Sequence, residues 1–551
     1  MKKWSMKILL SFVIVLAFFL RFYRVTEIPP SLNWDEVSIG YNAYSILKTG
    51  KDEWGRTLPV HFQSYGEYKL PVQVYASIPG ITIFGLNELG VRITPVVYGT
   101  LTVLVLFFLA RELSGKDSIG LISSFLLATS VWHIHLTRAS FESSFSVFWI
   151  VLGIWFAVKG FRAKKFWLFS TIPFALAIYT YNSARVFTPL FLLVMFWIYR
   201  KEILKHKKVL YKSVFIFVIF MLPLAAFWLG GEATARLKLV SITDDPGFVL
   251  RINKARGQTN LPAPLPQLIH NKVTHFTYVF TANYLSHFTP NYLFISGAPH
   301  KQHHVQMIGQ LYAFQAPFLI AGIFYLFKWR EKFRWILVSW VLLAFVPVSI
   351  TIDSIPHALR TLIAAPAYQI ITAYGIYWTC LVVRRKDLKL AFILVALIML
   401  SWTWQFRGYL DNYYNIYPKL YSRDWQYGNK QVVEFIKKHF VEYDLIVFTR
   451  HYGEPHMFTL FYFGWDPAKF QNDPNLNRFE TYDWVRVLNF DKFYFPDLGD
   501  TGTTFLDIVR DNGDKKILFV GKPGDFPSET PRLLTVDFLN GDGAFEVVEV
   551  K

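Results

Sequence analysis

The sequence predicts a polytopic α-helical membrane protein with a small α/β domain outside the membrane. Of its 551 residues, 53% are apolar and only 17% are charged, against roughly 25% charged residues in an average soluble domain. Eleven apolar segments occupy the first 406 residues, and hydropathy falls after them. Most are near the ~20 residues needed to cross a bilayer as a helix. These observations exclude a disordered chain, a fibrous protein and an ordinary cytosolic enzyme.

The first apolar segment is read as an uncleaved membrane helix. It follows three lysines and ends on Arg21 and Arg24, without the small-residue pattern of a cleavage site. A cleaved signal peptide is the alternative. The predicted spans are 8–25, 92–110, 119–137, 144–158, 166–182, 186–199, 213–230, 311–327, 335–350, 362–383 and 390–406.

The basic residues predict the orientation of these spans. With the N-terminus inside, the cytoplasmic segments contain 23 Lys and Arg residues, whereas the outer loop 26–91 contains four against seven acidic residues. This asymmetry follows the positive-inside rule. We therefore expect a multi-pass plasma-membrane protein with its C-terminal domain outside. The net charge of +18 then reflects topology, and no nucleic-acid partner is expected because no basic stripe marks a soluble face.

The predicted domains follow from the change in hydropathy. The membrane domain covers 1–406 with outer loops 26–91 and 231–310, a linker covers 407–430, and an α/β domain covers 431–551. Local signals predict these elements: a helix from about Asp35 to Lys48, capped by Asn33 or Asp35 and stopped by Gly50; a helix over Gln431–Phe440; strands over Asp444–Thr449 and Lys516–Val520; and a strand pair over 533–550. With Cys380 as the one cysteine, no intrachain disulfide or thiolate metal cage is expected.

Two adjacent carboxylates, Asp35 and Glu36, come shortly after the first span. They could act as a general base, as metal ligands, or as both. The alternative is that they only cap the following helix and match its dipole. Lys69, near the return to the membrane, could hold a phosphate or lie at the interface with its ammonium in water.

Further charged residues map to the same outer side. Arg138 and Glu142 are four residues apart and could form an ion pair on one helix face, or Glu142 could be a second acidic group beside Asp35. Arg185, His357 and Arg360 complete a candidate anion site, although each alone could be an interfacial anchor. A metal site at His300, His303 and His304 is a weaker alternative, because Lys301 lies among them.

These pieces occur in an order that resembles the GT-C glycosyltransferases, specifically the dolichyl-phosphate-mannose–protein mannosyltransferase-like family (glycosyltransferase family 39). The resemblance covers roughly residues 5–405. In the family the second acidic position is commonly Asp, one methylene shorter than Glu142. The carrying residues are Asp35-Glu36, Glu67-Tyr68-Lys69-Leu70-Pro71, Gly85 with Glu88 and Arg92, Leu136 to Glu142, Tyr179 to Arg185, and His357 with Arg360 and Pro366.

The resemblance implies sugar transfer, with inversion, from a polyprenyl-phosphate donor to an acceptor hydroxyl outside the cell. Asp35 would be the base, with Glu36 and Glu142 as further catalytic carboxylates. Lys69, Arg138, Arg185, His357 and Arg360 would bind the donor phosphate. Nucleotide sugars are cytosolic, so no nucleotide cofactor is expected. The sugar, the need for a divalent cation, and the choice among protein, glycan and lipid acceptors stay open.

Two other classes of function are compatible with a polytopic chain. A lipid or glycan transporter or flippase would place charged residues near the bilayer midplane and often contains repeated broken helices, whereas the ionisable residues here cluster on one side. A non-catalytic assembly scaffold would use the α/β domain for binding. An oligosaccharyltransferase catalytic subunit is disfavoured because its Trp-Trp-Asp-Tyr-Gly signature is absent.

Overall fold

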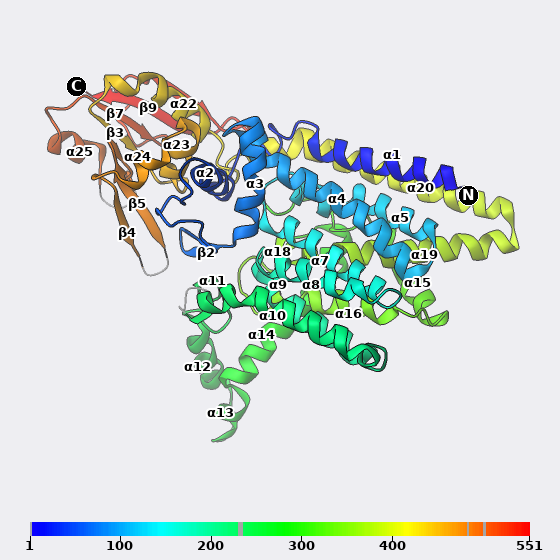
Figure 1. Cartoon of the computed structure of the whole chain (residues 1–551). Coiled ribbons are helices and arrows are strands. Elements are labelled where there is room, and N and C mark those ends of the chain that lie inside the picture. Colours follow the sequence, from blue (N-terminus) through cyan, green and yellow to red (C-terminus); the bar gives the residue numbers. More distant parts are fainter. Residues whose placement is uncertain (1–2, 230–234, 482–483, 500–502, 551) are drawn as a thin grey trace. The chain divides into compact units, whose positions relative to one another are not determined.

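The computed structural model describes residues 3–229, 235–481, 484–499 and 503–550 (Figure 1). The chain forms two compact units. The helical unit consists of Met1–Tyr23, Pro95–Thr137 and Glu142–Asp411, and the sheet unit consists of Arg24–Thr94, Arg138–Phe141 and Asn412–Lys551.

Helices account for nearly all regular structure of the helical unit. They are α1 (Lys3–Phe22), α4 (Glu88–Ser114, whose first residues belong to the sheet unit), α5 (Asp117–Ala128), α6 (Val131–Leu136), α7 (Glu142–Gly160), α8 (Lys165–Ile178), α9 (Asn182–Ile203), α10 (Lys207–Leu229), α11 (Ala235–Val240), α12 (Phe248–Gln258), α13 (Leu265–Ile269), α14 (Lys272–Ser286), α15 (Gln315–Lys328), α16 (Arg334–Ala344), α17 (Val346–Ser349), α18 (Ala358–Thr361), α19 (Ala365–Lys386) and α20 (Leu388–Asp411). The described part of 231–310, which the sequence predicts to be an outer loop, thus contains several helices.

Each of the eleven predicted spans contains helix among the residues that the structure describes. Among the described residues, five helical stretches are long and apolar enough to cross a bilayer: Trp4–Phe22, Glu88–Ser114, Glu142–Gly160, Asn182–Phe227 and Leu388–Leu420. Other spans are shorter or interrupted. In the third, the Ser130 side chain accepts a hydrogen bond from the backbone N–H of His133 and so begins a new helix, α6. The count of eleven stays a prediction.

The sheet unit combines one mixed sheet with helices from both ends of the chain. Its seven strands lie in the order β4-β5-β6-β3-β7-β9-β8; β3 runs parallel to β6 and β7, and the other pairs are antiparallel. Its elements are α2 (Trp34–Thr49), β1 (Phe62–Ser64), β2 (Glu67–Lys69), α3 (Pro71–Phe84), α21 (Tyr417–Leu420), α22 (Asn429–His439), β3 (Leu445–Phe448), α23 (Pro455–Phe463), α24 (Pro467–Gln471), β4 (Asn477–Glu480), β5 (Val485–Phe490), β6 (Phe493–Tyr494), α25 (Phe505–Asp511), β7 (Ile517–Gly521), β8 (Leu534–Asp537) and β9 (Gly543–Val550).

Local signals predicted several of these elements. The helix expected from about Asp35 is α2: Asn33 caps it in a reciprocal capping box with Glu36, and Gly50 ends it with a φ of 69°, where glycine is favoured. The helix expected from Gln431 is α22, the two buried strands are β3 and β7, and the final strand pair is β8 with β9. These predictions are confirmed.

The predicted linker over 407–430 is instead structured. Helix α20 continues to Asp411, a π-helical turn covers Asn412–Ile416, and α21 follows. Tyrosines recur every four residues here, at 409, 413, 417 and 421, which is the spacing of one helix face. The first three are at most 1% exposed. Hydropathy alone understated this segment because tyrosine is an amphipathic residue.

One apolar core joins the loop 26–91 to the C-terminal residues. It contains Val37 and Tyr41 of α2 together with Val433 of α22 and Phe461 of α23, all buried. Helices α2 and α23 lie side by side (Figure 1). The approach requires glycine at position 40, since a Cβ there would lie 2.6 Å from the Phe461 ring. The C-terminal region therefore supports the loop that carries the acidic pair.

Candidate functional site

Asp35 and Lys69 meet in the sheet unit. Asp35 lies in the first turn of α2, and Lys69 is the last residue of β2, which pairs antiparallel with β1. The Lys69 ammonium lies 2.7 Å from one Asp35 carboxylate oxygen and 3.8 Å from Glu67. The Asp35 side chain is 33% exposed, whereas Lys69 is 5% exposed. Asp35 is therefore an accessible carboxylate held in place by a buried cation.

Its neighbour Glu36 has a different environment. Glu36 is fully buried and accepts two hydrogen bonds from the Arg92 guanidinium, at 2.9 and 3.0 Å. It also accepts from the backbone N–H groups of Ser140, at 3.0 Å, and Asn33, at 3.3 Å. Its buried carboxylate oxygens are therefore satisfied by several hydrogen-bond donors. The two adjacent carboxylates therefore differ in their access to a ligand.

Two buried arginines hold the segment that precedes α2. Besides Glu36, Arg92 donates to the carbonyls of Pro29 at 2.8 Å and Ser31 at 2.5 Å. Arg138 is fully buried and donates to the carbonyl of Ile28 at 2.9 Å. The sequence pattern alone assigns no role to Arg92. An arginine at the end of an apolar span is nevertheless a feature that could have marked this residue as a candidate.

The sequence allowed Arg138 and Glu142 to share one helix face, but the two residues do not lie on one helix. Helix α6 ends at Leu136, Arg138 lies in the following turn, and Glu142 starts α7. Arg138 donates to the Tyr414 hydroxyl at 3.3 Å and lies over the ring of Tyr413.

Aromatic side chains surround the start of α2. The Tyr65 hydroxyl donates to the Trp34 carbonyl at 2.8 Å, and the Tyr65 ring stacks on Trp484 with 5.7 Å between centroids. Gln426 accepts a hydrogen bond from the Trp34 backbone N–H at 2.8 Å. Trp484 and Gln426 come from the C-terminal region. Sequence reasoning missed these contacts because each joins residues far apart in the chain.

Arg185 and Glu142 belong to the helical unit. Arg185 lies in the first turn of α9 and donates to the Asn182 side chain at 3.0 Å. Its Nε and Nη2 atoms are buried and, within the described ranges, have no hydrogen-bond partner. Glu142 attracts Arg185 electrostatically. An arginine with unused buried donors is suited to an anionic ligand.

His357 and Arg360 also lie in the helical unit, at α18. Arg360 is paired with Asp353 at 2.7 Å, so its charge is already balanced in part. The ring of His357 lies 5.0 Å from that of His303, which stacks on His300 at 3.7 Å. Burial lowers the pKa of His303 well below 6.5, and His300, His357 and Arg360 act in the same direction, which favours the neutral imidazole. Among the residues described, no group of three or more His, Cys, Asp or Glu side chains could hold a metal ion.

Two buried glutamates in the sheet unit make its stability depend on pH. Burial raises the pKa of both Glu53 and Glu454 to about 7. The positive charge of Arg478 and a hydrogen bond from Asn42 favour ionised Glu53, while Asp52 and Glu454 oppose ionisation. Arg486 and Arg450 favour ionised Glu454, and Asp497 opposes it.

We expect the unfolding temperature to fall as pH rises from about 5 to 7. The folded state holds these protons more tightly than the unfolded chain, so stability decreases as pH rises from the ordinary glutamate pKa to the raised value. Glu53→Gln removes one such group and should flatten the profile. Thermal unfolding of both proteins between pH 5 and 8 measures this. Parallel profiles would contradict the assignment to Glu53.

Comparison with known proteins shows the class of fold and a similarity to one family. The crystal structure of apo ArnT from Cupriavidus metallidurans matches with a TM-score of 0.53 at 13% identity, covering 98% of this chain and 97% of that chain. ArnT bound to undecaprenyl phosphate matches with a TM-score of 0.51 at 12% identity, covering 100% and 98%. The chain thus has a helical, polytopic membrane fold like that of ArnT, with a mixed β-sheet region near its C-terminus.

Residues 71–227 match the dolichyl-phosphate-mannose-protein mannosyltransferase family. This segment resembles a glycosyltransferase family 39 domain. An uncharacterized protein of Aquifex aeolicus (strain VF5) is 30% identical over 201 residues, which are 35% of this chain and 38% of that protein. The resemblance stated from the sequence motifs is confirmed.

Proposed function

We propose that the protein transfers a hexose from a polyprenyl-phosphate donor to an acceptor hydroxyl on the extracytoplasmic side. The observation that carries this proposal is the accessible Asp35 carboxylate held by Lys69 at 2.7 Å, in a chain with a family 39-like domain. The accessible carboxylate can receive a proton, and the ammonium can stabilise negative charge. ArnT, whose fold this chain shares, has been crystallised with undecaprenyl phosphate.

The proposed reaction inverts the anomeric carbon. The acceptor oxygen attacks this carbon, the bond to the phosphate oxygen breaks, and Asp35 takes the proton of the acceptor hydroxyl. Asp35 is a weak base, so proton transfer accompanies bond formation. The leaving polyprenyl phosphate gains negative charge, and cations placed near it favour the transition state over the ground state.

Different residues support different parts of this proposal. Lys69 orients Asp35 and can contact the donor. Glu36 and Arg138 are fully buried and act by positioning the loop. Arg185 is the strongest phosphate candidate of the helical unit, because two of its guanidinium nitrogens are buried without a partner in the described chain. Glu142, His357 and Arg360 stay predicted site residues.

We expect Lys69→Met to reduce transfer by ten- to a hundredfold, because it removes both the partner of Asp35 and a candidate phosphate contact. The purified protein in nanodiscs is assayed with polyprenyl-phosphate [14C]mannose or [14C]glucose and an envelope extract as acceptor. Polyprenyl-phosphate sugar that co-purifies is identified by mass spectrometry. Lys515→Met, an exposed lysine of the same unit, serves as the control. Parental rates for Lys69→Met would remove Lys69 from the site.

A further inference from the structure

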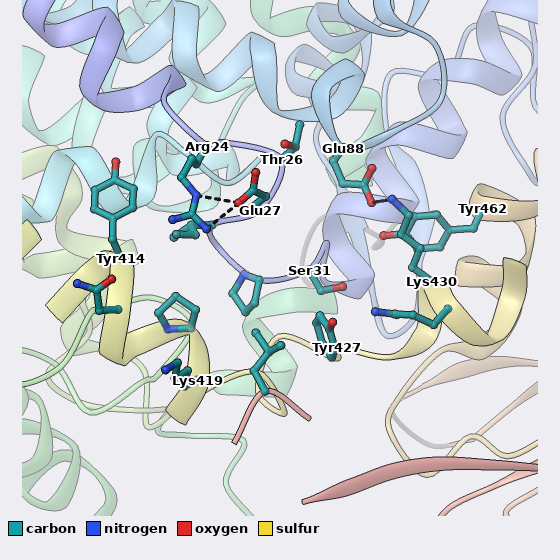
Figure 2. A pocket seen from close by; sticks show the side chains of 16 residues that line it. Arg24, Thr26, Glu27, Ser31, Glu88, Tyr414, Lys419, Tyr427, Lys430 and Tyr462 are labelled. Carbon is teal, nitrogen blue, oxygen red and sulfur yellow. Dashed lines mark hydrogen bonds and ion pairs between the residues drawn. The ribbon is translucent and has the colours of Figure 1, made fainter. Parts of the chain in front are cut away.

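The sheet unit contains a cavity that the proposed chemistry does not use. Its volume is about 550 Å³, within the ~300–1,000 Å³ typical of small-molecule sites. One wall is the segment between α1 and α2, and another is formed by residues of the C-terminal region (Figure 2). Both walls belong to the same unit.

Three tyrosine rings and several charged groups line this cavity. The rings are those of Tyr414, Tyr427 and Tyr462, which Figure 2 shows at different places around the wall. Tyr427 and Tyr462 also pack against the core. Tyrosine offers an apolar ring face and a hydroxyl on one side chain.

The charges in the cavity are mostly paired. Arg24 bonds Glu27 at 2.7 Å, and Lys430 bonds Glu88 at 2.9 Å (Figure 2). Lys419 is exposed and, within the described chain, has no acidic partner. The lining therefore carries one positive charge in excess. It also offers both hydrogen-bond donors and hydrogen-bond acceptors.

This chemistry discriminates among classes of ligand. A hydrocarbon chain would displace water from two ion pairs and a lysine without replacing their hydrogen bonds, which is unfavourable. A polyphosphate would need more unpaired cations than one lysine supplies. A saccharide fits both features, because its hydroxyl groups bond to polar and charged side chains while its C–H faces pack on aromatic rings.

We propose that this cavity binds a saccharide portion of the acceptor, so that the acceptor is a glycan. The inference rests on the proposed glycosyl transfer and adds the acceptor class to it. The cavity is continuous with the segment that carries the site: Ser31 lines it, and Asp35 follows four residues later. The Tyr414 hydroxyl at its rim accepts a hydrogen bond from Arg138.

Variants of the cavity test this role. We expect Lys419→Met and Tyr427→Phe each to raise the KM for the acceptor by threefold or more, and the double variant by tenfold or more, with the donor KM within twofold of the parent. Lys419 is exposed, so its replacement should not disturb folding, which thermal unfolding checks. Lys515→Met, at an exposed lysine outside the cavity, should leave both KM values unchanged.

The acceptor class is tested on the same envelope extract with the same two labelled donors. One portion is digested with protease, and another is treated with mild periodate, which cleaves vicinal diols of sugars. Incorporation of label should survive protease and be lost after periodate. Loss after protease with survival after periodate would identify a protein acceptor and overturn the proposal, as would an unchanged acceptor KM in the double variant.

Binding of polyprenyl phosphate by the parental protein is measured separately. If the protein neither binds polyprenyl phosphate nor transfers sugar to any portion of the envelope extract, the proposed function itself is refuted. A protein that binds the lipid and transfers sugar normally to periodate-treated material would refute only the saccharide cavity. Failure of the proposed function and failure of the saccharide cavity therefore give different experimental results.

Discussion

Asp35→Asn is expected to lower sugar transfer by about 10²–10⁴-fold, the usual effect of removing a general base. The amide cannot accept the acceptor's proton. Folding should change little, since Asn33 rather than Asp35 caps α2 and the lost Lys69 pair is partly exposed at Asp35. The measurement is initial transfer rate at saturating donor, together with the unfolding temperature.

The matched control distinguishes catalysis from electrostatics. Glu67→Gln also removes a carboxylate near Lys69, but at 3.8 Å rather than 2.7 Å. It should leave transfer within a fewfold of the parental rate. Near-normal transfer by Asp35→Asn would show that another group receives the proton, and the role of Asp35 would then be limited to the start of α2.

Arg92→Met is expected to destabilise the sheet unit strongly. It leaves Glu36 buried without its cation, and breaking a buried ion pair in this way costs about 3–5 kcal/mol. For a unit of about two hundred residues this corresponds to a fall of roughly 6–20 °C in unfolding temperature. Thermal unfolding of the purified protein measures the effect, and transfer should be lost in parallel because the segment before α2 loses its anchor.

Two further variants make this prediction specific. Arg510→Met removes an arginine whose side chain is 73% exposed, and its effect should be about 1 kcal/mol or less. Arg92→Met combined with Glu36→Gln removes both charges and should recover part of the loss. Equal unfolding temperatures for Arg92→Met and Arg510→Met would mean that the buried pair does not stabilise the unit.

Features of the chain that depend on nearby residues could be predicted from the sequence. Helix α2 carries its own start and stop signals at Asn33 and Gly50. Strands β3 and β7 are short apolar runs. The acidic pair was found because both carboxylates follow a membrane helix, and the basic loops predicted an orientation.

Features that depend on distant residues could not be predicted in this way. The carboxylate of Glu36 contacts Arg92, 56 positions later, and the backbone of Ser140, 104 positions later. No local pattern distinguishes a carboxylate satisfied by such contacts from an accessible one. The pairing of Lys69 with Asp35 likewise depends on the register of the β1–β2 hairpin. The different environments of the two carboxylates therefore became apparent only in the folded chain.

The core shared by α2 and the C-terminal residues also determines when α2 can be packed during synthesis of the chain. Residue 94, which ends the first part of the sheet unit, and residue 412, which begins the last, are separated by more than three hundred residues. At about 5–20 residues per second, the ribosome needs on the order of half a minute to make the intervening chain. During that interval the early apolar face of α2 has no partner from α22 or α23. Chains that end before α22 and α23 would therefore lack the core that supports the loop carrying Asp35, and we expect the proposed sugar transfer to begin only after these helices are made.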